Sequence, residues 1–179
     1  IKYKHIKEEH MKKKFLLVFA ILLVLGMSLS ACKAGEETVK KENEKLQAAT
    51  SAEIGDYLLR TLKFEDTLTK VDEDLMKNLY LVDASDFEDG SLYVPTYTAE
   101  EIAVIKVKNA DAKELKKYKK IFNDRIELQK SAFSVYRPEE VEKLDKALVY
   151  CKGNTAILVV SNDKEAAEKA IKNFGKDEE

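Results

Sequence analysis

The clearest strand signal in the sequence is residues 102–108 (IAVIKVK). Side chains on a strand alternate between two faces, so one face of this segment carries Ala103, Ile105 and Val107, whereas the other becomes polar at Lys106. Antiparallel sheets commonly leave one face in contact with water. The half-polar face therefore predicts a strand of an antiparallel sheet.

A long amphipathic helix is predicted after this strand. Asp111 followed by Glu114 is typical of a helix start, and apolar residues then recur at helical spacing. The stripe consists of Leu115, Tyr118, Ile121, Phe122, Ile126 and Phe133. We expect the helix to end near Tyr136, because Pro138 interrupts it and suits the first position of a new short helix that runs through Ala147.

Three further helices are predicted by a capping residue or by an acidic first turn. Thr50 and Glu53 have the spacing of a capping box before an apolar face that extends to Leu62. Residues 72–80 place apolar side chains on one face behind an acidic first turn. Asn162 or Asp163 can cap a last helix that reaches Phe174.

Two apolar runs, residues 147–151 and 155–161, indicate a β-hairpin. The Lys152-Gly153-Asn154 turn between them supplies residues that accept a positive φ. Residues 92–94 predict a short strand at the sheet edge, since Pro95 near its end cannot donate to a ladder. The order of elements predicts an α+β fold, with a small, mostly antiparallel sheet, helices packed on one face, and N-terminal helices before it.

The N-terminal segment has a different pattern, which is typical of an export signal. Three lysines, residues 12–14, precede the uninterrupted apolar run 15–25. This run is shorter than the roughly 20 apolar residues of a membrane-spanning helix, so we expect it to be removed. Leu29-Ser30-Ala31-Cys32 is similar to the lipobox of bacterial lipoproteins, in which the cysteine receives a diacylglyceryl group and becomes the first residue. The alternative is an ordinary signal peptide with a cysteine nearby by chance.

These patterns predict the organisation of the chain. We expect an untranslated leader at 1–10, a lipoprotein signal peptide at 11–31, a flexible tether at 32–49, a single α+β domain at 50–175 and a tail at 176–179. Met11 is the expected start, because Lys7-Glu8-Glu9-His10 can be encoded by a purine-rich ribosome-binding sequence. The tether is charged and has few large apolar residues to offset its ordering entropy, although a helix can extend back into it.

Cleavage before Cys32 would change the chemistry that the protein has available. Both histidines, His5 and His10, precede that point, which excludes nucleophile pairs and metal sites that need histidine. Six lysines and two glutamates are also removed, so the remainder is acidic and nucleic acid is not expected as a partner. Lipidation of Cys32 leaves Cys151 without a disulfide partner, and we interpret Cys151 as a small apolar strand residue rather than a reactive thiol.

No cofactor and no metal ion is predicted. The glycines after Cys32 are isolated, so no glycine-rich phosphate loop is present in the sequence. An acidic stretch comprises Asp83, Asp86, Glu88 and Asp89. Its spacing does not match a calcium-binding loop, and a solvated acidic turn is the favoured interpretation.

Arg125 and Gln129 are the candidate ligand-binding residues. On a helical wheel Gln129 falls near the centre of the apolar stripe and Arg125 at its edge. Either the two face a pocket, or Gln129 bonds to backbone while Arg125 pairs with a carboxylate at the domain rim. The second interpretation is favoured, because buried polar groups usually have structural partners.

Several motifs resemble the bacterial family called domain of unknown function 4358. They are residues 101–108, Arg125, Gln129, Tyr136-Arg137-Pro138 and the Gly153-Asn154 turn with the strand after it. The resemblance covers roughly residues 85–174. It implies a secreted lipoprotein of a Gram-positive bacterium and carries no assigned activity.

The expected function is that of a non-catalytic, lipid-anchored module at the extracytoplasmic face of the cell membrane, which binds a protein, a peptide or a wall component. The alternative is an envelope enzyme that uses carboxylates or a Ser-Lys pair without histidine, which requires a concave pocket with convergent polar groups. A small-ligand carrier for a transporter is a third interpretation, although such receptors are usually two-lobed and larger.

Overall fold

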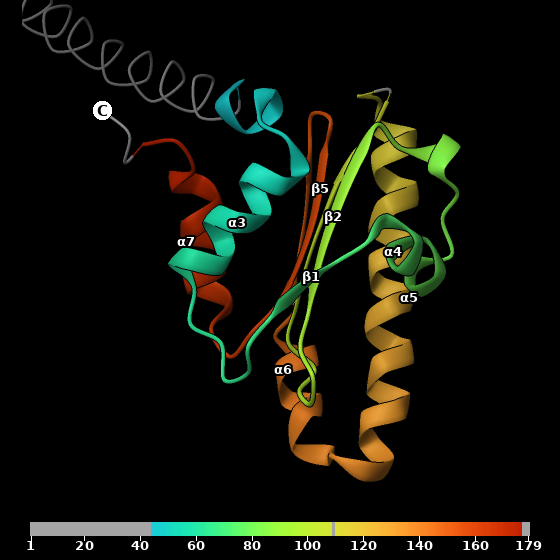
Figure 1. The fold of residues 1–179 in the computed structure, drawn as a ribbon, viewed down its shortest axis with the longest axis vertical. Helices are drawn as coiled ribbons and strands as arrows, with labels where there is room; N and C mark the ends of the chain where they lie inside the picture. Colours follow the sequence, from blue (N-terminus) through green and yellow to red (C-terminus); the bar gives the residue numbers. More distant parts are fainter. Residues whose placement is uncertain (1–43, 109, 177–179) are drawn as a thin grey trace, which may run out of the picture. The chain divides into compact units, whose positions relative to one another are not determined.

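The computed structural model describes residues 44–108 and 110–176 of the chain (Figure 1). Its elements are α3 (Ser51–Thr61), β1 (Thr69–Val71), α4 (Glu73–Tyr80), a 3-10 turn (Ala84–Asp86), β2 (Asp89–Val94), β3 (Glu101–Lys106), α5 (Ala112–Tyr136), a second 3-10 turn (Pro138–Glu140), α6 (Val141–Asp145), β4 (Leu148–Lys152), β5 (Thr155–Val160) and α7 (Lys164–Asn173). Residues 44–48 are also helical. The predicted signal peptide and Cys32 lie outside the described residues.

The strands form one five-stranded sheet in the order β1-β2-β3-β5-β4. Every neighbouring pair is antiparallel, and in the centre Ala103 of β3 pairs with Leu158 of β5. The predicted α+β class with an antiparallel sheet is therefore confirmed. The prediction that residues 92–94 form an edge strand was wrong, because β2 lies between β1 and β3. Pro95 lies just beyond the end of β2, where it costs no ladder bond.

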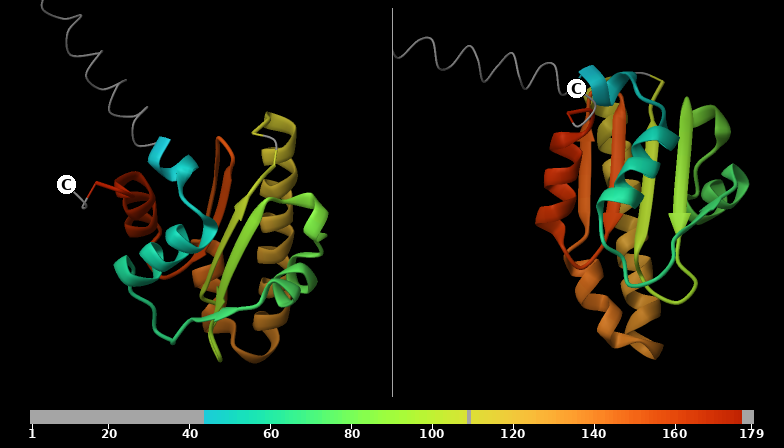
Figure 2. Two further views of the ribbon diagram at one scale, coloured as in Figure 1. Left: turned by 45° about the horizontal axis from the view of Figure 1, so that its top comes forward. Right: turned by 60° about the vertical axis from the view of Figure 1, so that its left-hand side comes forward.

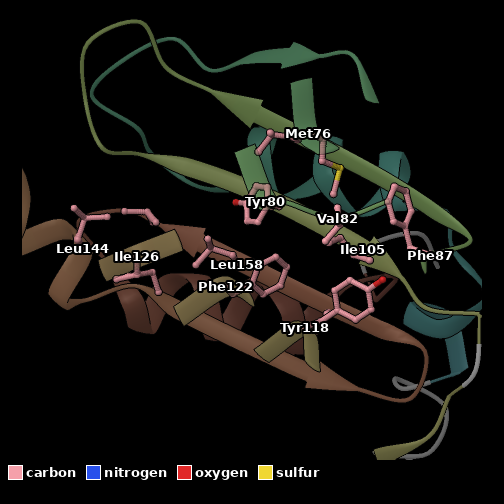
Figure 3. Close-up of a cluster of buried hydrophobic side chains, with 14 of the residues drawn as sticks. Met76, Tyr80, Val82, Phe87, Ile105, Tyr118, Phe122, Ile126, Leu144 and Leu158 are labelled. Atoms are coloured by element: carbon pink, nitrogen blue, oxygen red, sulfur yellow. The ribbon is translucent and has the colours of Figure 1, made fainter. Parts of the chain in front are cut away.

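Helices cover both faces of the sheet, as two views at different angles show (Figure 2). On one face Ala103, Ile105 and Leu158 pack against α4, α5 and α6 (Figure 3). On the other face Ile102 and Val104 pack against α3 and α7. The prediction of helices on one face was wrong, because the second face of β3 is polar only at its end and is otherwise apolar enough to bury a second helical layer.

Side-chain caps start the helices at the predicted places. Thr50 and Glu53 form the expected capping box, in which the Glu53 N–H donates to Thr50 Oγ1 at 3.2 Å and the Thr50 N–H donates to Glu53 Oε2 at 2.7 Å. Aspartates cap three later helices: Asp72 for α4, Asp111 for α5 and Asp163 for α7. Each accepts an orphan backbone N–H of the first turn, which stabilises the helix by about 1 kcal/mol.

The packed part of the chain begins before the predicted boundary at Thr50. Leu46 is 3% exposed and belongs to the apolar cluster between the sheet and α3 and α7. Lys106 Nζ donates to the carbonyl oxygens of Leu46 at 3.0 Å and Gln47 at 2.9 Å. The predicted tether at 32–49 is thus too long at its C-terminal end. One leucine and the carbonyls of this helical segment are enough to attach it to the sheet.

The predicted hairpin turn between β4 and β5 is confirmed. Gly153 has φ +60, in the left-handed region that glycine adopts without strain. A Cβ atom at this position would lie 2.5 Å from Gln47 Cδ. The Asn154 side-chain amide donates to the Gln47 carbonyl at 3.2 Å. The positive φ therefore favours glycine at this turn, whereas the exposed Gln47 side chain could move aside for a Cβ atom.

None of the helices within residues 44–108 and 110–176 is long and apolar enough to cross a membrane.

Candidate functional site

Arg125 and Gln129 converge on a single carboxylate, that of Glu101. Arg125 Nη2 donates to Glu101 Oε2 at 2.7 Å, and Gln129 Nε2 donates to the same oxygen at 3.1 Å. The Tyr80 hydroxyl donates to Glu101 Oε1, and Arg125 Nε is 3.3 Å from that oxygen. We call Tyr80, Glu101, Arg125 and Gln129 the Glu101 cluster. It connects α4, β3 and α5.

The positions of these residues in their elements bring them together. Arg125 and Gln129 are four residues apart on α5 and so lie on the same side of the helix. Glu101 alternates with Ile102 on β3, and it therefore points to the same face as Ala103, towards α5. Tyr80 is the last residue of α4, whose buried side packs on that face. Its ring also contacts Phe122 edge-on, at 5.6 Å between centroids (Figure 3).

The Glu101 cluster is a buried ion pair with additional donors. The Glu101 side chain is 1% exposed and that of Arg125 13%. Burial acts to lower the pKa of Arg125, but the Glu101 carboxylate outweighs it and raises the pKa, so the guanidinium stays charged. Burial and the charge of Glu101 raise the pKa of Tyr80 well above its ordinary value, so its hydroxyl remains a donor.

The polar side chains of the Glu101 cluster form their hydrogen bonds with one another. Each Glu101 oxygen already accepts two donors, so the carboxylate is not available to take a proton from a substrate without breaking them. Arg125 pairs with a carboxylate as the favoured interpretation predicts, and Gln129 bonds to that carboxylate instead of backbone. Gln129 Oε1 is buried and has no hydrogen-bond partner among the described residues. The ligand-binding role of Arg125 and Gln129 stays a prediction.

A second ion-pair cluster, which the sequence does not reveal, joins α6 to the loop before β1. Lys143 Nζ is 2.6 Å from Glu65 Oε2 and 3.1 Å from Glu140 Oε2. Lys143 is 4% exposed and Glu140 1%. Burial acts to lower the pKa of Lys143, but its hydrogen bonds to the two carboxylates raise it, so the amine stays protonated. We call Glu65, Glu140 and Lys143 the Lys143 cluster.

Glu100 is also completely buried, next to Glu101 in the chain. Its carboxylate accepts the backbone N–H of Glu65 at 2.9 Å and that of Asp66 at 3.0 Å. The Ala99 N–H donates in turn to Glu140 Oε2 at 2.8 Å. Hydrogen bonds from two backbone N–H groups and the nearby charge of Lys143 compensate the burial of this carboxylate. The two loops that flank the sheet at this point are held together by acidic side chains.

The enzyme alternative with a Ser-Lys pair needs a side-chain hydroxyl next to a lysine amine. On the sheet, Lys106 and Thr155 form such a pair. Lys106 Nζ donates to Thr155 Oγ1 at 2.8 Å, and its other protons are directed at the two carbonyls of the 44–48 segment. Burial lowers the pKa of Lys106. Thr155 is 0% exposed, so its hydroxyl does not reach a substrate in this packing. The pair fixes the N-terminal segment to the sheet.

The acidic stretch is distributed over several structural contacts. Asp83 accepts the Ser85 N–H at 3.0 Å, Asp86 pairs with Lys117 at 3.2 Å, and Asp89 accepts the Ser51 N–H at 2.6 Å. In the part of the chain that the structure describes, no three His, Cys, Asp or Glu side chains are arranged to hold a metal ion. Asp83 and Asp86 belong to the 3-10 turn and its cap, as the interpretation of this stretch as a turn expects, whereas Asp89 begins β2.

Cys151 lies in β4, as its interpretation as a strand residue predicts, and packs partly against the α5 side of the core. Burial raises the pKa of its thiol to about 11 and outweighs the charge of Lys119, which acts in the opposite direction. The thiol is therefore almost entirely protonated at neutral pH.

This pKa predicts slow alkylation of Cys151. In a Cys32→Ala variant Cys151 is the only thiol of the chain. We expect iodoacetamide to modify it at pH 8 at least about tenfold more slowly than free cysteine, because the thiolate fraction falls about 200-fold and its higher nucleophilicity recovers only part of this. The rate should rise about tenfold per pH unit between 8 and 10. Mass spectrometry of timed samples gives the rate, and a rate equal to that of free cysteine contradicts the prediction.

A groove lies between α3, the 44–48 segment and the end of α7. It has a volume of about 670 Å³. Its lining includes Ala48, Glu53, Asp56, Tyr57, Arg60 and Phe174. We call it the α3–α7 groove. Residues that are more than a hundred positions apart form it, and for this reason the sequence pattern does not reveal it.

Comparison with known proteins identifies one family. The model of the family described as Domain of unknown function (DUF4358) matches residues 60–161. No curated protein and no solved structure matches the chain. The matched region begins and ends earlier than the resemblance over 85–174 implies. It contains the Glu101 and Lys143 clusters, whereas of the α3–α7 groove it contains only Arg60. The chain belongs to the DUF4358 family.

Proposed function

We propose that this chain is a lipid-anchored extracytoplasmic protein that binds a partner at the cell envelope without catalysing a reaction. The observation that carries the anchor is the order of residues 12–32, in which lysines, an apolar run and Leu29-Ser30-Ala31-Cys32 follow one another at the spacing of a lipoprotein signal. Two acyl chains on Cys32 would supply a durable anchor, at about 0.8 kcal/mol per buried CH₂.

The binding role is supported by how the buried ionisable groups are used. Glu101 is saturated by donors from Tyr80, Arg125 and Gln129, and Lys143 is held between two carboxylates. A catalytic acid or base needs a proton-transfer path to a substrate. These groups instead hold helices and loops to the sheet, which is what a rigid binding scaffold requires.

The α3–α7 groove is the concave feature that we assign to binding. Its distance from the anchor is limited, since only residues 33–43 separate Cys32 from the described chain. Fully extended, these residues span at most about 40 Å. A groove that includes Lys45 and Ala48 would therefore stay within about 40 Å of the anchored cysteine plus its own distance from residue 44.

The anchor is tested by labelling cells with a radioactive or alkyne-tagged fatty acid. We expect the wild-type protein to carry the label and its N-terminal peptide to begin at a lipidated Cys32. Replacement of Cys32 by alanine should abolish the label, because the acyl chains have no thiol to receive them. Labelling is the readout rather than membrane retention, since an uncleaved apolar segment would also stay in the membrane.

The matched control is Cys151→Ala, which removes the other thiol and should keep the full label. A wild-type protein without fatty acid, or a label that survives in Cys32→Ala, contradicts the anchor.

A further inference from the structure

We propose that the α3–α7 groove binds a short peptide of two or three residues with free termini and an apolar side chain. This inference rests on the proposed binding function and names its ligand. Arg60 receives the peptide carboxylate, Glu53 and Asp56 receive the ammonium group, and the rings of Tyr57 and Phe174 contact the apolar side chain.

The groove has the size and the lining of a small-ligand site. Its volume of about 670 Å³ lies within the range of about 300–1,000 Å³ of such sites. Ala48 and Ala49 have small side chains on one wall and leave the space open. The rings of Tyr57 and Phe174 meet edge-on at 5.2 Å between centroids and are both only half-buried. An apolar side chain can therefore bury aromatic surface that is exposed to water in the free protein.

The charged residues of α3 lie in one line along this groove. Asp56, Tyr57 and Arg60 lie three, four and seven residues after Glu53, which places the four on one side of the helix. Ile54 and Leu58 occupy the opposite, buried side. The exposed line thus presents an anionic group at its N-terminal end, an aromatic ring in the middle and a cation at its C-terminal end.

Some hydrogen-bonding atoms of these charged side chains have no partner among the described residues. Asp56 accepts the Tyr93 hydroxyl at 2.6 Å through Oδ1, and Glu53 accepts the Thr50 N–H through Oε2. Their other oxygens, Asp56 Oδ2 and Glu53 Oε1, accept no hydrogen bond from the described residues. Arg60 is exposed and makes no hydrogen bond or ion pair within 44–108 and 110–176. A ligand that carries both charges would satisfy both ends.

The spacing of the charges fits a peptide of this length. Along α3, at 1.5 Å per residue, Arg60 lies about 6 Å from Asp56 and about 10 Å from Glu53. An extended peptide spans about 3.3–3.6 Å per residue, so two residues bridge the shorter distance and three the longer. The lining carries two cations, Lys45 and Arg60, and two carboxylates, Glu53 and Asp56. An anionic lipid head group would be attracted by the cations but repelled by the carboxylates, whereas a peptide with free termini is matched by both. The pattern of charge therefore favours a peptide over the membrane surface.

The test is calorimetric titration of the lipidated protein in detergent micelles with the tripeptide Ala-Phe-Ala. We expect saturable binding, and we expect affinity to fall at least about tenfold when both peptide termini are capped, which is the effect of losing one charge-assisted hydrogen bond. Arg60→Glu should weaken the binding of the uncapped peptide by the same factor. Tyr57→Ala should lower the affinity for Ala-Phe-Ala by a larger factor than the affinity for Ala-Ala-Ala, because only the first peptide has a ring to contact Tyr57.

The matched control is Lys116→Glu, which reverses an exposed charge on α5 far from the groove lining and should leave affinity unchanged within about twofold. The thermal midpoint of each variant shows that it is folded. The proposal is overturned if no saturable binding occurs up to about 10 mM peptide, or if the capped peptide binds with equal affinity. It is also overturned if the Cys32→Ala chain binds phosphatidylglycerol vesicles in a way that depends on Arg60. Failure here leaves the fatty-acid labelling of Cys32 unaffected, so the ligand and the anchor are tested separately.

Discussion

Replacement of Arg125 by methionine should lower the free energy of unfolding by about 3–5 kcal/mol, because it leaves the Glu101 carboxylate buried without its cation. Methionine retains the volume and the helix propensity of the arginine stem, so the loss reports mainly on charge. Tyr80 and Gln129 would still donate to Glu101, but neither is charged. Urea denaturation followed by circular dichroism measures the difference.

Two variants separate the charge effect from a general loss of packing. Lys116→Met removes an exposed cation from the same helix and should change stability by less than about 0.5 kcal/mol. The double variant Arg125→Met/Glu101→Gln removes the buried charge as well and should be more stable than Arg125→Met. Equal stability of the single and double variants would show that the buried charge is not the cause.

Replacement of Lys143 by methionine should cost about 3 kcal/mol, since Glu140 loses its nearest cation while only 1% exposed. The value lies at the lower end of the range for a broken buried pair for two reasons. Arg137 remains 3.5 Å from Glu140, and the Glu65 side chain is 59% exposed and can return to water. The same denaturation experiment gives the result.

The control for Lys143 is Lys146→Met, one turn further on. Lys146 pairs with Glu142 at 2.7 Å, but both side chains are largely exposed, so its loss should cost at most about 1 kcal/mol. If Lys143→Met costs no more than Lys146→Met, the Lys143 cluster is solvated in solution and does not hold the loop before β1.

Local signals predicted the elements of this fold well. Capping depends on side chains within three residues of the helix start, so spacing alone predicts the starts at Thr50 and Asp111, while for the last helix it leaves Asn162 and Asp163 open and the structure has Asp163. Strand alternation assigned the faces of β3 correctly, with Ala103 and Ile105 on one side.

The arrangement of those elements was less predictable. Whether a helix covers the second face of β3 depends on α3 and α7, which lie on either side of the sheet strands in the sequence. Pro95 predicts an edge position for β2, and the strand that lies outside it, β1, has only three residues, too few for the sequence pattern to reveal. Leu46 is a single apolar residue in a charged segment, so composition indicated a tether there.

For the candidate sites too, the sequence predicts what depends on one element and not what depends on how elements pack. The helical wheel placed Gln129 inside the core, and the pairing of Arg125 with a carboxylate was favoured. The identity of that carboxylate, Glu101, depends on how β3 faces α5, which sequence spacing does not encode. Lys143 and Glu65 are brought together only by the complete fold. The α3–α7 groove likewise needs both ends of the described chain.

The order of the strands also determines how long the sheet stays incomplete while the chain is being made. Central strand β3 pairs with β5, yet residues 107–154 lie between them in the sequence. At about 5–20 residues per second a ribosome takes about 2–10 s to make this stretch. During that time β2 can protect one edge of β3, while the other edge waits for a strand that does not yet exist. Since all six residues of β3 are buried in the finished protein, the unfinished chain carries an apolar strand edge that must be kept from other chains until Val160 has been added.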